Sequence, residues 1–181
     1  AHLHVHSQYS ILQATADVRS LVNKAVEMGM PAVGLTDHNN MFGAYKFIET
    51  ILNHPVNSAV NDGEEPVLKA VLGCELNVCK NHMDKSVKDY GAQIPFLCKN
   101  IKGFHNLAKL SSLGNIDGFY YVPRIDREII KKYKEDIIVL TGNLYGEVPS
   151  KILNLGETQA EDALLWWKEE FKDDLYIELM R

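Results

Sequence analysis

The sequence predicts a single α/β domain in which strands and helices alternate. Short runs of apolar and β-branched residues indicate strands, and the segments between them carry apolar residues at the spacing of one helical face. The length of 181 residues and the apolar content of 46% are ordinary for one globular domain. Six predicted strands, mostly separated by helices, suit a mainly parallel sheet. Open doubly wound sheets and closed barrels both fit this alternation, and the abrupt end of the sequence after a strand suggests a barrel that stops before closure.

The first half of the chain predicts strands and helices joined by polar loops. Its expected strands are 3–6, 32–36, 67–78 and 94–99. Its expected helices are 17–28, 42–52 and 103–113. The clearest strand is 32–36, a continuous apolar run typical of a buried parallel strand. The clearest helix is 17–28, because its apolar residues share one face and Gly29 stands at the helix stop. The polar segments 54–66 and 79–92 predict loops.

The second half repeats the alternation less regularly. Helices are expected at 126–133, 148–153 and 157–171, and strands at 136–140 and 175–179. The β-branched residues of 136–140 favour a strand, and the apolar residues of 157–171 align on one helical face. Trp166 and Trp167 are about 100° apart around that helix, so one of them is expected to face the core.

Composition and charge limit the classes of function. Lys and Arg total 19 and Asp and Glu total 24, a net charge of −5, so DNA binding by the chain alone should be weak. No apolar run reaches the roughly 18 residues of a membrane span, and no secretory signal is visible. The three cysteines include no Cys-x-x-Cys pair, which favours a reducing cytoplasm over a disulfide framework.

Three histidines alternate with Leu and Val at the start of the chain. Side chains two residues apart share one face of a strand, so His2, His4 and His6 are expected to point the same way. Two imidazoles at this spacing can bind one metal ion, and imidazole suits zinc, iron and manganese. A tag remnant or three ordinary polar residues are the alternatives, but the intervening apolar residues favour a genuine strand. Metal binding is therefore predicted, mainly for His4 and His6.

Two further strands carry polar side chains near their ends. Asp37 and His38 follow the apolar run 32–36, and Glu75 lies in the strand 67–78. Sites in parallel α/β folds are built at the carboxyl ends of strands, and a buried acid is costly unless it is paired or binds metal. For Asp37 and His38, a site and a simple helix start capped by the following Asn remain equal alternatives. If these strand ends meet, they form a metal site suited to hydrolysis, since a bound ion polarises a phosphate oxygen and activates water.

Other features give weaker signals. Cys74 is expected to be a small core residue rather than a reactive thiol, because no basic residue stands beside it. The segment 118–124 joins aromatic residues to an Arg, which favours a packed turn over a base-stacking surface, and both remain open. The histidines expected to be solvated are His54, His82 and His105.

Several motifs resemble those of one family. His-Leu-His-Val-His-Ser at 2–7, Leu-Thr-Asp-His at 35–38 and Gly-Cys-Glu at 73–75 resemble successive motifs of the polymerase and histidinol phosphatase (PHP) domain. Gly-Phe-Tyr-Tyr-Val-Pro-Arg-Ile-Asp at 118–126 and Gly-Glu-Val-Pro at 146–149 are similar to the PHP domain at the N-terminus of bacterial DNA polymerase III alpha subunits. The resemblance covers residues 1–181 as one domain of a larger polymerase. It implies a distorted, TIM-like β/α barrel, seven-stranded in the family and truncated here near its C-terminal end.

The resemblance also implies roles for individual residues. The positions that match metal ligands are His4, His6, His38 and Glu75. Asp37 matches a residue beside the metals, so Asp37 and His38 are the expected catalytic residues. The implied cofactor is a divalent metal ion, zinc or manganese, at partial occupancy.

Three positions depart from the family pattern. Gln13, Gln93 and Asn143 stand where the family often has Asp, His and Cys. Amides are poorer ligands for transition metals than these side chains, so the site is expected to be eroded. The family's last Asp-x-His pair is expected beyond residue 181.

Two functions from different classes follow from the resemblance. With an eroded site, the domain is expected to be a structural and interaction module of the polymerase alpha subunit, in DNA replication. Its partners would be the remainder of that subunit and a separate proofreading exonuclease subunit, and it would reach DNA through the full-length protein. The alternative is an active metal-dependent phosphoesterase, either a proofreading 3′–5′ exonuclease or a histidinol-phosphatase-like enzyme for small molecules. The three substitutions favour the first. Both imply a cytoplasmic protein without a membrane partner.

Overall fold

The computed structural model describes residues 1–58 and 64–180, which hold six strands and seven α-helices. The strands are β1 (Ala32–Leu35), β2 (Lys69–Cys79), β3 (Ala92–Cys98), β4 (Ile125–Asp126), β5 (Ile137–Leu140) and β6 (Leu175–Tyr176). The helices are α1 (Val18–Glu27), α2 (Ala44–Leu52), α3 (Pro55–Ser58), α4 (Ile101–Ile116), α5 (Arg127–Tyr133), α6 (Glu147–Asn154) and α7 (Glu157–Phe171). The predicted α/β class is confirmed.

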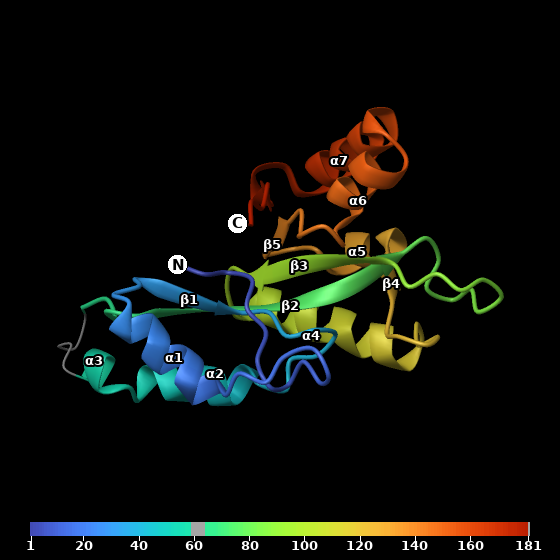
Figure 1. Ribbon diagram of the computed structural model, residues 1–181. Helices are drawn as coiled ribbons and strands as arrows, with labels where there is room; N and C mark the ends of the chain where they lie inside the picture. Colours follow the sequence, from blue (N-terminus) through green and yellow to red (C-terminus); the bar gives the residue numbers. More distant parts are fainter. Residues whose placement is uncertain (59–63, 181) are drawn as a thin grey trace.

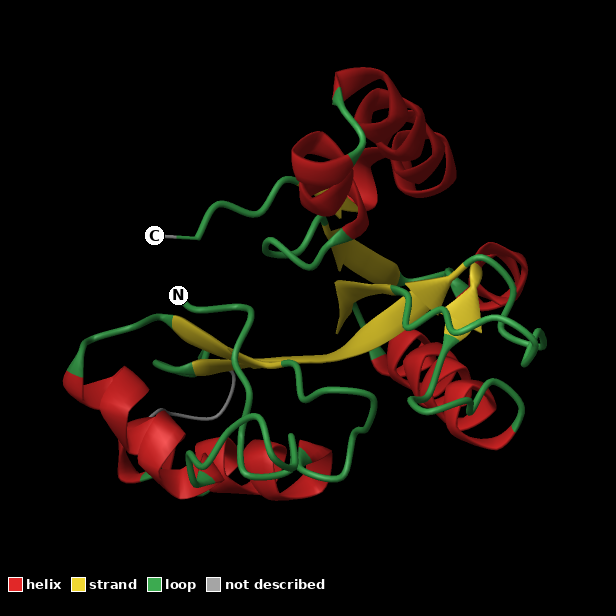
Figure 2. Ribbon diagram, turned by 45° about the vertical axis from the view of Figure 1, so that its right-hand side comes forward, coloured by secondary structure: helices red, strands yellow, loops and turns green. Residues whose placement is uncertain are grey.

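The strands form one mixed sheet with helices on both faces. Its order is β1-β2-β3-β5-β6, and β4 pairs with the far end of β2. In Figure 1, α1, α2 and α4 lie beneath the sheet while α6 and α7 lie above it. Figure 2 shows the same layers from another side. The long β2 links the two halves, because β1 pairs with its beginning and β3 with its second half.

The prediction of a mainly parallel sheet is wrong at β3, which runs antiparallel to both β2 and β5. The physical reason lies in the connection. The segment between β2 and β3 contains no helix, and strands joined by a loop alone pair antiparallel, whereas parallel neighbours need a crossover. The pairings β1–β2, β2–β4 and β5–β6 are parallel. Within the described residues the sheet is open, since β1 and β6 end its order.

The strand predicted at 3–6 does not form a regular ladder. A bridge joins His2 to Val33, and Val5 accepts a hydrogen bond from Thr36 N at 2.8 Å. The Val5 N–H, however, bonds to the Thr36 hydroxyl at 3.0 Å instead of a backbone carbonyl. Gly34 allows this close approach, because a Cβ there would lie 2.6 Å from the Leu3 carbonyl oxygen. The N-terminal segment therefore lies extended along β1 without being a full strand.

The helices begin where capping side chains satisfy free backbone N–H groups. Asp17 caps α1 by accepting from Ser20 N, and Asn100 caps α4 by accepting from the N–H groups of Lys102 and Gly103. The predicted helix 157–171 is confirmed residue for residue as α7.

Shorter elements differ from expectation. The predicted loop 54–66 contains the one-turn helix α3, and its residues 59–63 lie outside the described part of the chain. The strand predicted at 175–179 is limited to the two residues of β6, and the two-residue strand β4 was not predicted.

Two apolar clusters hold the layers together. The larger one joins β2, β3 and β5 to α4, α5 and α7, and includes Phe96, Leu107, Ile130 and Trp167. The smaller one joins β1 to α1 and α2 through Val22, Leu35 and Phe47. Of the two adjacent tryptophans, Trp167 is buried and Trp166 is partly exposed, as the helical spacing predicts. Cys74 is fully buried in the larger cluster, and burial raises the pKa of its thiol, which fits the prediction of a core residue.

Candidate metal centre

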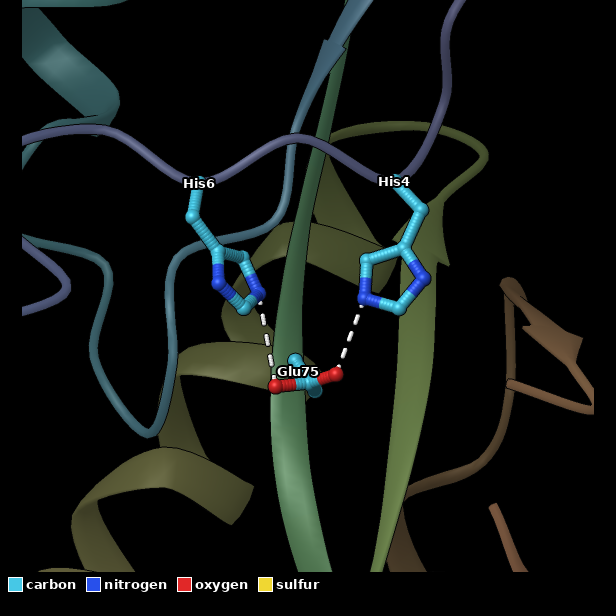
Figure 3. Close-up of side chains that lie close together, drawn as sticks. All are labelled: His4, His6 and Glu75. Atoms are coloured by element: carbon cyan, nitrogen blue, oxygen red, sulfur yellow. Dashed lines mark hydrogen bonds and ion pairs between the residues drawn. The ribbon is translucent and has the colours of Figure 1, made fainter. Parts of the chain in front are cut away.

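Two of the three N-terminal histidines converge on one buried carboxylate. His4 Nε2 lies 2.8 Å from Glu75 Oε1, and His6 Nε2 lies 3.3 Å from Glu75 Oε2. Figure 3 shows both imidazoles pointing from the N-terminal segment toward Glu75 on β2. One ligand atom from each of the three side chains lies within 4.8 Å of the others. The predicted alternation of residues 2–6 therefore places His4 and His6 as expected.

A third imidazole approaches the same carboxylate from the end of β1. His38 Nδ1 lies 2.6 Å from Glu75 Oε2, and a parallel backbone bridge joins the two residues. The bridge keeps the register of the β1–β2 pairing three residues beyond the Leu35–Leu72 pair, and this explains why a residue after β1 faces a residue inside β2. The structure thus brings His4, His6, His38 and Glu75 together. His2 is exposed and belongs to none of the contacts of this cluster.

The donor set fits a divalent metal ion. His6 Nε2 is buried, and its 3.3 Å contact with Glu75 Oε2 is an ion pair that does not meet hydrogen-bond geometry, so among the residues that the structure describes it makes no hydrogen bond. A buried polar atom without a partner is uncommon and asks for an explanation such as an ion or a water. Two imidazoles and one carboxylate are a known ligand combination for zinc, and the same donors suit manganese. The geometry supports a divalent ion and leaves its identity open.

The cluster perturbs the titration of its own members. Burial works to raise the pKa of Glu75, but hydrogen bonds from His38 and His4 and the nearby His6 imidazole hold it well below its usual range. Burial works to lower the pKa of His4, but hydrogen bonds to Glu178 and Glu75 raise it to about 9. Without an ion, these pKa shifts pair a protonated His4 with an anionic Glu75, and a bound metal ion would take the place of the proton on His4 Nε2.

Glu178 was not predicted as a site residue. Its carboxylate accepts a hydrogen bond from His4 Nδ1, at 2.9 Å to Oε1, and it comes from the segment after β6. A carboxylate on the outer nitrogen of an imidazole fixes the orientation of the ring, as carboxylates do behind many metal-binding histidines. Nothing in the local sequence marks Glu178, because its partner lies 174 residues away.

Asp37 is buried beside the cluster and has other partners. Its Oδ1 accepts hydrogen bonds from Ser7 N at 2.6 Å and from the Ser10 hydroxyl at 2.7 Å, and its Oδ2 accepts from the Ser7 hydroxyl at 2.7 Å. The Ser10 hydroxyl in turn accepts from His38 N. These bonds fasten the N-terminal segment to the end of β1. The structure therefore places Asp37 behind the ligands rather than among them.

Two of the three residues that depart from the family pattern, Gln13 and Gln93, line one cleft, and the third, Asn143, precedes two residues that do. The cleft has a volume of about 1120 Å³, and Gln13, His38 and Gln93 belong to its lining. Asn143 is absent from that lining, although the next two residues belong to it. Its side-chain oxygen accepts from Tyr145 N at 2.9 Å and so stabilises a turn. The structure brings Gln13 and Gln93 to the cleft that His38 borders, and it gives Asn143 a local structural use.

Two sequence expectations away from the metal cluster have clear outcomes. Arg124 is fully buried, and its guanidinium donates four hydrogen bonds to backbone carbonyls, which agrees with the packed turn expected for 118–124. The expectation that His82 is solvated is wrong. Its Nδ1 lies 2.5 Å from Asp126 Oδ2, and its side chain is mostly buried. The cause is the side chain of Asp126, which also caps α5 and draws the loop toward that helix.

Comparison with known proteins places the chain in a family. A family model described as PHP domain matches residues 2–181. The chain belongs to the PHP domain family.

Curated relatives of this PHP domain are polymerase subunits. DNA polymerase III subunit alpha of Chlamydia muridarum is 39% identical over 181 residues, which cover 98% of this chain and 14% of that subunit. The subunits of the same name from Aquifex aeolicus and Borreliella burgdorferi are 38% and 35% identical, and each is covered to 15%. The PHP domain thus spans about one seventh of the length of these relatives.

Among solved structures, one match is a protein provisionally named a metal-dependent phosphoesterase, from Bifidobacterium adolescentis. The TM-score is 0.41 and the sequences are 18% identical, with 62% of this chain and 32% of that chain covered. A similarity this distant supports no inference about the PHP domain.

None of the helices in the described ranges is long and apolar enough to cross a membrane.

Proposed function

We propose that this PHP domain is the N-terminal domain of a DNA polymerase III alpha subunit, in the cytoplasm, and that its role there is mainly structural. In this role the His4–His6–Glu75 cluster binds one divalent ion, zinc or manganese, at partial occupancy. The remainder of the subunit is its partner, and proofreading falls to a separate exonuclease subunit. In the complete domain, strands beyond residue 181 close the open sheet into the distorted barrel implied by the resemblance.

The observation that carries the proposal is the convergence of His4, His6 and Glu75, in which the buried His6 Nε2 makes no hydrogen bond among the described residues and has only an ion-pair contact with Glu75 at 3.3 Å. When bound, the ion supplies a strong positive charge that holds the N-terminal segment against β2 and can polarise an oxygen ligand. Asp37 positions the segment through Ser7 and Ser10, and Glu178 orients the His4 ring. Because the group of potential ligands found among the described residues has three members, we expect a single ion.

A thermal melt with and without added zinc or manganese tests this role. Metal bound only by the folded state stabilises it by mass action, about 2.7 kcal/mol at a concentration 100 times the dissociation constant. That gain corresponds to a melting temperature higher by roughly 5–11 °C for a domain of this size. His6→Ala should abolish the response, and His105→Ala, which changes an exposed histidine on α4, should keep it. An equal response of all three proteins would contradict the proposed cluster.

A second function, an active phosphoesterase, is favoured by two observations. Three protein ligands leave a coordination position open, as in catalytic zinc sites, and the large cleft reaches His38 beside the cluster. In such an enzyme His38 and Asp37 would be the catalytic residues. The cleft volume of about 1120 Å³ lies at the upper end of the roughly 300–1,000 Å³ usual for small-ligand sites, so the volume is compatible with both a nuclease and a small-molecule phosphatase.

Release of nucleotides from a single strand in zinc or manganese tests the second function. We expect little release by the parent and more after Gln13→Asp and Gln93→His, because these changes return an anion and an imidazole to the cleft. Asn143→Cys completes the set but removes a turn contact, so it is added last. Rapid release by the parent that His6→Ala abolishes would establish the enzyme and overturn the structural role.

A further inference from the structure

Two neighbouring loops present half-exposed aromatic rings, and one of these rings, that of Tyr90, lines the cleft. Tyr90 lies in the loop between β2 and β3, Tyr121 lies between α4 and β4, and their side chains are 47% and 60% exposed. Their ring centroids are 6.3 Å apart. The Lys88 ammonium lies 5.1 Å from the centroid of Tyr90 and 4.8 Å from that of Tyr121. We call these three residues the aromatic platform.

Hydrogen bonds from the buried Arg124 join the two loops that carry the aromatic platform. The buried guanidinium of Arg124 bonds to carbonyls of both loops, those of Gly118 and of three residues between 82 and 89. Tyr120 packs between this guanidinium and Tyr121, with its ring centroid 5.4 Å from the Arg124 Cζ and 4.7 Å from the Tyr121 ring. Tyr121 has a φ of 64°, which a non-glycine residue adopts only where its surroundings enforce it. Rigid, exposed aromatic rings bind planar ligands with little loss of conformational entropy.

The loop that carries Tyr90 is basic although the whole chain is acidic. Lys80, Lys85 and Lys88 stand within nine residues, and none of them forms an ion pair with any residue in 1–58 or 64–180. The two acids of the loop point to its own backbone instead. Asp84 accepts from Ser86 N and Oγ, and Asp89 accepts from the N–H groups of Lys80 and Gly91. The lysine ammonium groups thus remain available to an anionic ligand.

The cleft extends from Tyr90 of the platform to His38, whose imidazole contacts Glu75 of the metal cluster. Its lining includes Tyr90 and Lys80 at the platform end and His38 beside the cluster. Its volume of about 1120 Å³ lies at the upper end of the range usual for ligand sites. A ligand that satisfies both ends needs planar apolar faces and repeated negative charges, which are the properties of a single-stranded polynucleotide.

We propose that the aromatic platform binds single-stranded nucleic acid by stacking bases on Tyr90 and Tyr121, while the lysines of the loop contact phosphates. The strand then runs along the cleft toward His38, and this direction rests on the proposed metal centre. The net charge of −5 keeps the affinity for nucleic acid low, so we expect the platform to bind a strand weakly and reversibly. The loops that carry Tyr90 and Tyr121 can contact the same strand, because the hydrogen bonds of Arg124 to both loops hold them next to each other.

Fluorescence anisotropy of the chain with a labelled oligothymidylate of about 12 nucleotides tests the platform, since such sites span roughly 4–16 nucleotides. The titration is done in EDTA at low salt, so that it does not depend on metal binding. We expect micromolar or weaker binding that declines with salt. Tyr90→Ala combined with Tyr121→Ala should weaken it at least about fivefold, because stacking contributes about 1–3 kcal/mol per base.

Three controls make the result specific. Phe at both positions should restore the affinity, because a phenyl ring also stacks. Tyr45→Ala removes an exposed tyrosine on α2, outside the cleft lining, and should leave the affinity unchanged. Melting temperatures of all variants show whether each is folded. Equal affinity of the double Ala variant and the parent, no binding by the parent at low salt, or a preference for duplex would each overturn the proposal, whatever the metal experiments show.

Discussion

The buried Arg124 offers a stringent test of how this fold is held together. Its side chain is 1% exposed, and its guanidinium donates to four backbone carbonyls at 3.0–3.2 Å. The acceptors belong to Gly118, Asp89, His82 and Asp84, so one side chain joins two loops that contain little regular structure. Arg124→Met keeps most of the side-chain volume and removes all four donors.

The expected loss of unfolding free energy in Arg124→Met follows from these hydrogen bonds. A hydrogen bond involving a charged group contributes about 1.5–3 kcal/mol, but burying the guanidinium offsets part of the sum of four. Arg124→Met leaves four backbone carbonyls without this donor, at about 1–3 kcal/mol for each one that water does not reach, and relief of the buried charge offsets part of that cost. For Arg124→Met we therefore expect a loss near 4 kcal/mol and a melting temperature lower by roughly 8–16 °C.

Urea unfolding followed by circular dichroism measures the change. Arg19→Met is the matched control, because Arg19 is exposed on α1, and surface substitutions usually change stability by less than about 0.5 kcal/mol. Faster proteolysis within 80–91 should accompany the loss in Arg124→Met. A loss below about 1 kcal/mol would show that the burial penalty cancels the hydrogen bonds, and the argument would be wrong.

Two further predictions concern the pH dependence and the packing. Burial works to raise the pKa of Asp126, but hydrogen bonds from His82 and from backbone N–H groups lower it below its ordinary 3.8. Its contribution to stability is therefore complete above that value and is lost as the pH falls below it. Asp126→Asn should be less stable than the parent at pH 7 in urea unfolding, and the difference should shrink toward pH 3; a constant difference would exclude this linkage. Gly103→Ala places a methyl group 2.1 Å from the Asp136 carbonyl oxygen and should cost about 1–3 kcal/mol in the same assay, whereas an unchanged midpoint would mean that α4 shifts freely.

Local patterns predicted most of the helices and strands. The helix 157–171 was predictable because its apolar residues repeat at helical spacing, and α7 has these bounds. The direction of β3 could not be read from its own residues, since alternation is the same in parallel and antiparallel strands. The loop before it held that information, because it has no helical pattern. The strand β4 was missed because two residues give no periodicity and Asp126 also caps α5.

The candidate site was predictable as far as each residue had a local signal. His4, His6, His38 and Glu75 lie on or beside apolar strands, where polar residues stand out, and they do meet. The contacts of Asp37 with two serines could not be predicted, since they depend on a tight turn in the N-terminal segment. Glu178 could not be predicted either, because it acts through His4 from the other end of the chain.

The contact between His4 and Glu178 has a consequence for folding during synthesis on the ribosome. The two residues are separated by 174 positions, and synthesis at about 5–20 residues per second delivers the second one roughly 9–35 s after the first. During that time β1, α1 and α2 can already pack around their own apolar cluster. Until then, the His4 Nδ1 has no hydrogen bond to the Glu178 carboxylate. The metal cluster therefore reaches its final geometry only after the segment that carries Glu178 has emerged and docked.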